Sequence, residues 1–213
     1  MKIAITGNKL LREQLESRHT AEAIEWVHTE TPEEFDQHQD AELFIDLNFT
    51  NDPHRISELA KLLPAPVLVN AVSDTLQEIG RPFIRINAWP GFAERPCDEL
   101  VAPDEETAVR LSTVYNRLGW RSRFVADIPG MVTARIIAAI INEAYYTLQA
   151  EVSTKEEIDT AMRLGTNYPY GPFEWSHRIG LNSIHHLLCV LSKEEERYSP
   201  AAALSAELGL KFS

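Results

Sequence analysis

Short apolar runs that alternate with helix-patterned segments are the feature that most constrains this fold, and they occupy residues 1–126. Alternating strands and helices indicate a parallel sheet with crossover helices. The runs are rich in Val, Ile, Leu and Phe with little polar alternation, which is typical of strands covered on both faces. The sequence therefore predicts an α/β unit. The expected strands are 2–6, 23–27, 43–47, 66–71 and 83–88, and the expected helices are 10–18, 53–63 and 107–118.

The strand patterns stop near residue 127, and the rest of the chain reads as helices. Pro129 and Gly130 precede a long apolar segment, and later polar and glycine residues have the positions of helix caps. We therefore predict two domains, an abbreviated Rossmann-like parallel sheet over 1–126 and an all-α domain over 127–213. An apolar helix is expected over 136–148. A capping box at Ser153–Glu156 is expected to begin the next helix, and Gly165 to end it. Asn182 is expected to cap a third helix, and a last helix is expected to begin at Ser199–Pro200 and to end at Gly209.

Charge and hydropathy exclude several kinds of partner. The formal net charge is -12 and no run rich in Lys or Arg exists, so binding to a nucleic-acid backbone is not expected. No apolar run reaches the length of about 18 residues that a membrane helix needs. Residues 1–5 lead directly into a strand pattern, so we expect a soluble, cytoplasmic protein. Cys97 and Cys189 do not make a disulfide framework and are expected to be reduced.

A dense Gly/Pro/aromatic pattern at 164–174 resembles the C-terminal domain of 3-hydroxyacyl-CoA dehydrogenases. Residues 164–174 read Leu-Gly-Thr-Asn-Tyr-Pro-Tyr-Gly-Pro-Phe-Glu. The similarity extends over Asp-Ile-Pro-Gly-Met-Val at 127–132, Asn-Glu-Ala at 142–144 and Ile-Gly-Leu-Asn at 179–182. The resemblance implies a role related to fatty acid metabolism and a homodimer formed through the helical C-terminal domain, which we expect to bury about 2,000 Å² or more.

Members of that family bind a nicotinamide cofactor at the first strand-to-helix turn through Gly-x-Gly-x-x-Gly. The glycines allow a tight turn and a close approach of the backbone to the pyrophosphate. Residues 7–12 read Gly-Asn-Lys-Leu-Leu-Arg here, and the resemblance assigns the cofactor contacts to Gly7, Asn8 and Lys9. If Gly7 is the first position, Lys9 and Arg12 stand at the other two glycine positions, and if Thr6 is the first, Asn8 and Leu11 do. We therefore expect NAD(P) to bind weakly or not at all.

The crossing after the second expected strand also differs from the family. A helical insertion there contributes to coenzyme A binding in the family, whereas this chain crosses in a short polar segment from Glu30 to Glu42. Glu30 is the nearby carboxylate for a cofactor ribose, and a solvated loop charge is its simpler interpretation.

The family's general base is a histidine, followed twelve residues later by the glutamate that orients it. Asn87 and Glu99 have that spacing here. An amide does not accept a proton near neutral pH, so Asn87 is able to hydrogen-bond a hydroxyl or carbonyl group but not to act as a base. The loss of a general base costs about 10²- to 10⁴-fold in rate.

Three further positions of the family's chemistry are changed. Thr50 stands at the place of an active-site glutamate, and Ala134 stands at the place of an asparagine that polarises the substrate carbonyl. Val72 occupies the place of a substrate-orienting serine, and Ser73 follows it by one residue. Alternation along a strand turns Ser73 to the opposite face unless the following turn redirects it.

Three functions follow as hypotheses. The first is a family member that has lost ordinary hydride transfer and acts as a dimeric binding or scaffolding protein for a nucleotide, an acyl thioester or a partner enzyme. The second is an active NAD(P)-dependent oxidoreductase on a small hydroxyacyl or ketoacyl substrate, with Asn87, Glu99 and Ser73 at its catalytic site. The third, a metal protein built on His185 and Cys189, lacks further ligands nearby in the sequence, so no metal is predicted.

Overall fold

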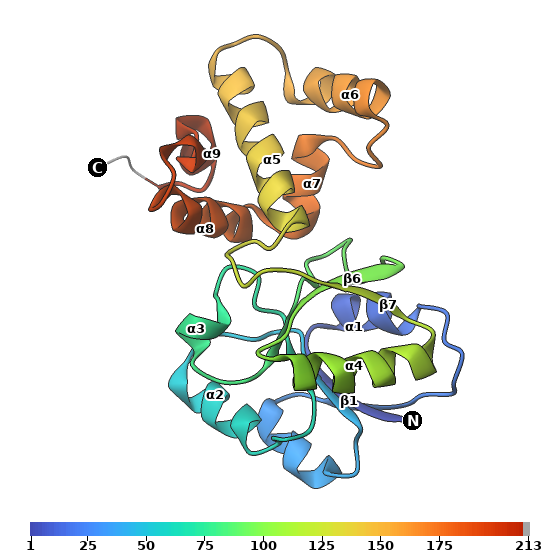
Figure 1. The fold of residues 1–213 in the computed structure, drawn as a ribbon. Helices are drawn as coiled ribbons and strands as arrows, with labels where there is room; N and C mark the ends of the chain where they lie inside the picture. Colours follow the sequence, from blue (N-terminus) through green and yellow to red (C-terminus); the bar gives the residue numbers. More distant parts are fainter. Residues whose placement is uncertain (211–213) are drawn as a thin grey trace. The chain divides into compact units, whose positions relative to one another are not determined.

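A computed structural model describes residues 1–210 of the chain. It divides into two compact units, one from Met1 to Met131, called the N-terminal unit, and one from Val132 onward, called the helical unit (Figure 1). The sequence placed the division slightly earlier, after residue 126. Within residues 1–210, no helix is long and apolar enough to cross a membrane, and a cytoplasmic location stays a prediction.

The N-terminal unit is built on one sheet of seven strands in the order β2-β1-β3-β4-β5-β6-β7, counted over the described residues. All neighbouring pairs are parallel except β5 and β6, which are antiparallel. The predicted α/β class with a mostly parallel sheet is thus confirmed. The strands are β1 (Lys2–Thr6), β2 (Glu25–Thr29), β3 (Leu43–Asp46), β4 (Val67–Val69), β5 (Ile84–Ile86), β6 (Cys97–Val101) and β7 (Arg121–Phe124).

Helices cover both faces of this sheet. One apolar core joins the sheet to α1 (Lys9–Glu16) and α4 (Glu105–Leu118) through Leu11, Leu15 and Leu111. The other core joins the opposite face to the 3₁₀ helix η1 (Pro32–His38), to α2 (Pro53–Ala60) and to α3 (Leu76–Ile79). Continuous apolar strands are what such two-sided burial requires, and the central strand β3 is buried at every position.

The helical unit is organised around the long helix α5 (Thr133–Gln149), drawn in yellow in Figure 1. It contacts α7, α8 and α9, and its buried face carries Ile137, Ile141 and Tyr145. Asn142 on this helix donates to the carbonyl of Ser199 and accepts from the backbone N–H of Ala201, both at 2.8 Å. The other helices are α6 (Lys155–Thr166), α7 (Pro172–Ile179), α8 (Leu181–Ser192), η2 (Glu196–Tyr198) and α9 (Ala202–Glu207).

The close packing of one carboxylate, that of Asp159, accounts for the glycine at position 171. Asp159 on α6 accepts from the backbone N–H groups of Phe173 at 2.8 Å and Glu174 at 3.1 Å, which are free donors at the start of α7. A side chain at Gly171 would place its Cβ 2.3 Å from that carboxylate. Pro172 opens α7, where the missing N–H costs no hydrogen bond.

Several predicted helix boundaries were wrong. The capping box at α6 is formed by Thr154 and Glu157, not by the preceding pair of residues. Gly165 lies inside α6, which ends at the left-handed residue Asn167. Asn182 lies inside α8, which follows Gly180 directly, and the last helix begins at Ala202 rather than at Ser199–Pro200.

Candidate active site

The turn between β1 and α1 approaches the end of β3 too closely for any residue but glycine. Gly7 has φ +143°, and a Cβ atom there would lie 2.6 Å from the Cβ of Leu47. The backbone N–H of Leu47 also bonds to the carbonyl of Thr6 at 2.9 Å. Packing against β3 therefore accounts for Gly7 whether or not a dinucleotide binds here.

Two backbone amide groups at this turn bond to side chains of the protein itself. The side chain of Asn8 accepts from the backbone N–H of Leu11 at 2.9 Å and so caps α1. The N–H of Asn8 in turn donates to Oδ1 of Asn48, after β3, at 3.3 Å. The Lys9 side chain is 81% exposed and lies 3.6 Å from Glu13. Two of the donors that would bind a pyrophosphate at a helix start are thus directed to side chains of this chain.

A third asparagine links the ends of the next strands. Asn70, just after β4, donates from Nδ2 to the carbonyl of Leu47 at 3.2 Å. Its Oδ1 accepts from the backbone N–H of Ala88, just after β5, at 3.0 Å. Asn8, Asn48 and Asn70 therefore connect the carboxyl ends of β1, β3, β4 and β5, which is the edge where ligands bind in open α/β sheets.

Asn87 and Glu99 are brought together, as their assignment to one site requires. They lie opposite each other where the antiparallel strands β5 and β6 continue, with the N–H of Asn87 3.4 Å from the carbonyl of Glu99. Asn87 is 4% exposed, and its Oδ1 accepts from the N–H of Trp89 at 3.4 Å. Ser73 lies after β4 and is half-buried.

The sequence of this chain is similar to those of known dehydrogenases. Residues 130–209 match the family model for the 3-hydroxyacyl-CoA dehydrogenase C-terminal domain. A 3-hydroxyadipyl-CoA dehydrogenase from Escherichia coli (strain K12) is 38% identical over 145 residues, which cover 65% of this chain and 30% of that protein. A probable 3-hydroxybutyryl-CoA dehydrogenase from Bacillus subtilis (strain 168) is 30% identical over 166 residues, covering 76% of this chain and 57% of the relative. This chain belongs to the 3-hydroxyacyl-CoA dehydrogenase family.

A crystal structure of (S)-3-hydroxybutyryl-CoA dehydrogenase from Ralstonia eutropha shares the fold of this family member. The TM-score is 0.76 at 18% identity, and the match covers 98% of this chain and 93% of that one. The matched parts of the two sequence relatives, by contrast, span less than two thirds of those proteins.

Two more positions of the dehydrogenase pattern have local structural roles. Thr50 donates from Oγ1 to Asp52 at 2.7 Å, and Asp52 caps α2. Ala134 is fully buried in the helical unit. His28, the other imidazole considered for base chemistry, lies on β2 with Nε2 2.7 Å from Glu16 at the surface.

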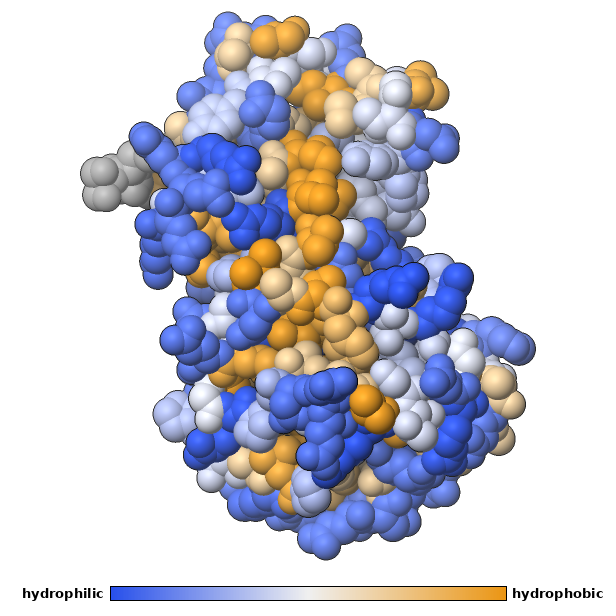
Figure 2. All heavy atoms as spheres, in the orientation of Figure 1, coloured by the Kyte–Doolittle hydropathy of each residue, from blue (hydrophilic) through white to orange (hydrophobic). Residues whose placement is uncertain are grey.

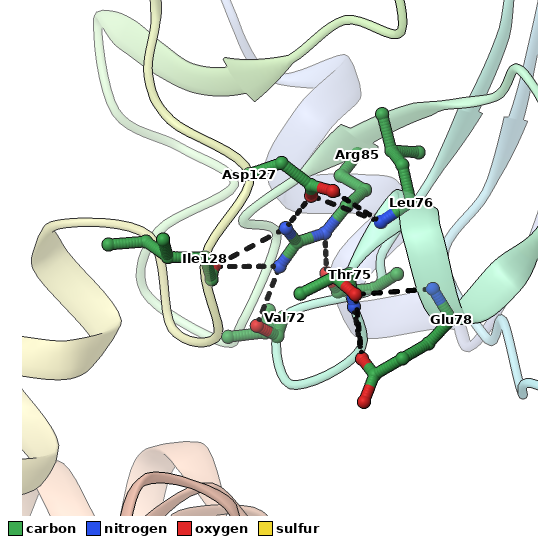
Figure 3. Close-up of polar contacts among 8 residues, drawn as sticks. Val72, Thr75, Leu76, Glu78, Arg85, Asp127 and Ile128 are labelled. Carbon is green, nitrogen blue, oxygen red and sulfur yellow. Dashed lines mark hydrogen bonds and ion pairs between the residues drawn. The ribbon is translucent and has the colours of Figure 1, made fainter. Parts of the chain in front are cut away.

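Arg85 is a buried residue of this edge that sequence reasoning missed. It stands in the middle of β5, fully buried, and its guanidinium donates to the carbonyls of Ala71 at 2.9 Å and Val72 at 3.0 Å (Figure 3). It also pairs with Asp127 at 2.5 Å and contacts the Ile128 carbonyl at 3.3 Å. Burial lowers the pKa of Arg85, and the Asp127 charge opposes this shift. Arg85 thus fixes the loop that carries Ser73.

The signal for Arg85 was present in the sequence. An arginine interrupts an otherwise apolar strand, and a buried cation needs a carboxylate and carbonyl partners. Asp127 also accepts from the backbone N–H of Leu76 at the start of α3, at 2.9 and 3.0 Å. The Asp-Ile-Pro-Gly segment of the family resemblance therefore begins with the carboxylate that balances Arg85.

His185 and Cys189 do face each other on α8. The thiol of Cys189 lies 3.6 Å from Nδ1 of His185, and Nε2 of His185 lies 3.3 Å from the hydroxyl of Ser205. Burial raises the pKa of Cys189 and lowers that of His185, which disfavours the thiolate that soft metals require. In residues 1–210 no group of three or more His, Cys, Asp or Glu side chains is arranged to hold a metal ion.

Proposed function

We propose that this family member no longer performs ordinary hydride transfer and acts as a dimeric binding or scaffolding protein. The observation that carries the proposal is the hydrogen bonding of the β1–α1 turn, where Asn8 caps its own helix and Asn48 binds the N–H of Asn8. A dinucleotide would have to displace both interactions and approach a turn that carries side chains in place of two glycines.

The second support is the chemistry of Asn87. By the spacing of the family resemblance, Asn87 takes the place of the histidine base and Glu99 that of the glutamate, and an amide has no lone pair that accepts a proton near neutral pH. Hydride transfer from a hydroxyacyl substrate needs a group to remove the hydroxyl proton, so the rate would fall by about 10²- to 10⁴-fold even with cofactor bound.

Titration with NADH and NADPH, followed by an acetoacetyl-CoA reduction assay, tests this proposal. We expect no saturable binding at micromolar cofactor and no turnover in the usual enzyme range of about 1 to 10³ per second. Asn87→His alone is expected to leave turnover undetectable, because the obstacle at the β1–α1 turn is unchanged. Micromolar binding accompanied by turnover in that range in the unmodified chain would refute the proposal.

The alternative is an active NAD(P)-dependent oxidoreductase on a small hydroxyacyl or ketoacyl substrate; the two sequence relatives are named as dehydrogenases of 3-hydroxyacyl-CoA compounds. One observation favours it: Nη1 of Arg12, one turn into α1, is buried without a hydrogen-bond partner among the described residues. A cofactor phosphate would supply that partner, beside Gly7, Asn8 and Lys9. In this alternative Asn87, Glu99 and Ser73 contact the substrate, and the titration above distinguishes the two functions.

The helical unit supports the dimer part of the proposal. Ile136 on α5 is 50% exposed and Val132, which precedes α5, is 45% exposed. An apolar cavity of about 400 Å³ opens between α5 and α6, lined by Ile140, Val152 and Met162 among others. Figure 2 shows hydrophobic residues gathered along α5 on the face in view. We propose that a second copy covers this surface, and that a small-molecule or acyl-CoA ligand is bound by the dimer.

Sedimentation velocity tests the dimer. Ile136→Glu is expected to convert a dimer of the unmodified chain to a monomer at micromolar concentration, because the carboxylate would be buried without a partner at the interface. Val109→Glu on α4 is the matched control, since Val109 is a 59% exposed aliphatic residue of the N-terminal unit. A clean monomer for the unmodified chain, or equal dissociation by both variants, would contradict this assignment.

A further inference from the structure

A cationic pocket lies in the N-terminal unit at residues that play no part in the candidate active site. It has a volume of about 360 Å³ and lies between the end of α1, the loop before β6 and the start of β7. Three arginines and one histidine line it, against a single acidic residue, Glu94. In a chain with a formal net charge of -12, such a local excess of cations marks a place where an anion is attracted. The three arginines are Arg18, Arg95 and Arg121, and the histidine is His19.

Arg18 is a buried side chain that lines this pocket, and the carboxylate of Asp98 balances its charge. Its guanidinium makes two hydrogen bonds of 2.7 Å to Asp98 and one of 2.6 Å to the carbonyl of Ala93. Asp98 also accepts from the hydroxyl of Tyr115 at 2.9 Å, and the Arg18 guanidinium lies 5.0 Å from the ring centre of Trp120. Because its donors are engaged, Arg18 shapes the pocket and leaves ligand binding to the other cations.

Arg95 lines this pocket without an ion pair among the described residues. Its guanidinium stacks on the ring of Phe92 at 3.9 Å and makes no hydrogen bond found among residues 1–210. Burial lowers the pKa of Arg95, with only the through-space charge of Glu99 opposing this shift. Partly buried guanidinium donors that lack acceptors carry a desolvation penalty, which an anion would remove.

Arg121 supplies a second group of unused donors at the same pocket. Its Nε donates to the carbonyl of Pro96 at 3.3 Å, and no ion pair of Arg121 is found among the described residues. Most other arginines of the chain have carboxylate partners, for example Arg55 with Asp46 and Arg135 with Glu195. Arg95 and Arg121 therefore stand out as two cations that line one pocket without forming an ion pair among the described residues.

We propose that this pocket binds the phosphate group of a small phosphate monoester, held between Arg95 and Arg121 with His19 at the rim. The planar guanidinium fork matches phosphate oxygens in two-bond geometry, and a cavity of this volume accommodates a phosphate with a short organic substituent. The site is separate from the β1–α1 turn, so it stands whether or not the chain binds NAD(P).

Calorimetric titration at constant ionic strength, with inorganic phosphate and glycerol 3-phosphate as probes, tests the proposal. We expect saturable one-to-one binding of both, weakened about tenfold or more by Arg95→Gln and by Arg121→Gln, since each removes charge-assisted hydrogen bonds. Arg123→Gln is the matched control, because Arg123 is a residue of the same strand that does not line this pocket. It is expected to change affinity by less than about twofold, as a screened surface charge does.

Two outcomes would overturn the proposal. One is the absence of saturable binding of either probe to the unmodified chain, with the fold verified by circular dichroism. The other is a loss in Arg123→Gln equal to that in Arg121→Gln, which would mean diffuse attraction rather than a site. A thermal-unfolding series adds an independent readout, because a bound anion raises the midpoint with concentration, and this rise should vanish in the Arg95 and Arg121 variants.

Discussion

Replacing Asp98 by asparagine is expected to lower the free energy of unfolding by about 3–5 kcal/mol, because it leaves the buried guanidinium of Arg18 without its counter-charge. The two side chains are 1% and 7% exposed, and their nitrogens and oxygens are 2.7 Å apart. The variant also weakens the acceptor for the buried hydroxyl of Tyr115. Urea unfolding followed by fluorescence of the nearby Trp120 measures the loss.

The exposed ion pair of Arg117 and Glu42 is the matched control for that experiment. Both side chains are about two-fifths exposed, at 42% and 40%. Glu42→Gln should leave the urea midpoint nearly unchanged, since exposed pairs are screened by water and salt. Similar losses in the two variants would contradict the structural role given to Asp98.

Gly7→Ala should also destabilise the N-terminal unit strongly, by about 3 kcal/mol or more. The backbone at φ +143° is a conformation that residues with a side chain rarely adopt, which costs about 1–3 kcal/mol. The new Cβ would in addition lie 2.6 Å from that of Leu47, so β3 or the turn has to move. Thermal unfolding of the variant without any nucleotide measures this effect.

Gly165→Ala is the matched control for the glycine variant. Gly165 is inside α6, and an added Cβ meets no atom within 4 Å. Alanine is the better helix former, so this variant should gain about 0.5–1 kcal/mol. If Gly7→Ala were as stable as the unmodified chain yet altered in nucleotide binding, Gly7 would be kept for a ligand rather than for packing.

The fold was predictable wherever local pattern decides the outcome. Apolar runs identified β1 to β5, and the helical character of the second half followed from its spacing and caps. The strands β6 and β7 were missed because their sequences, Cys-Asp-Glu-Leu-Val and Arg-Ser-Arg-Phe, carry charges. Asp98 is tolerated inside β6 only because Arg18, far away in the sequence, neutralises it, and no local pattern reports such a partner.

The sequence allowed candidate site residues to be named, but it did not allow their hydrogen-bond partners to be predicted. Asn87 was paired with Glu99 through the family resemblance, because the histidine and glutamate of that family have the same spacing. The hydrogen bonds of Asn8, Asn48 and Asn70 depend on four strand ends meeting, and an asparagine after a strand is equally typical of an ordinary turn. Arg85 was overlooked for the same reason, since the carboxylate that balances it is forty-two residues away.

The asparagine hydrogen bonds across the strand ends bear on whether the stability of the fold depends on a bound nucleotide. In a dehydrogenase that depends on its coenzyme to satisfy the polar groups of that crevice, depletion of the nucleotide exposes those groups and weakens the fold by mass action. Here amide side chains satisfy several of them from within. On the proposed function, in which no nicotinamide nucleotide binds, the stability of the fold should therefore not depend on the concentration of that nucleotide.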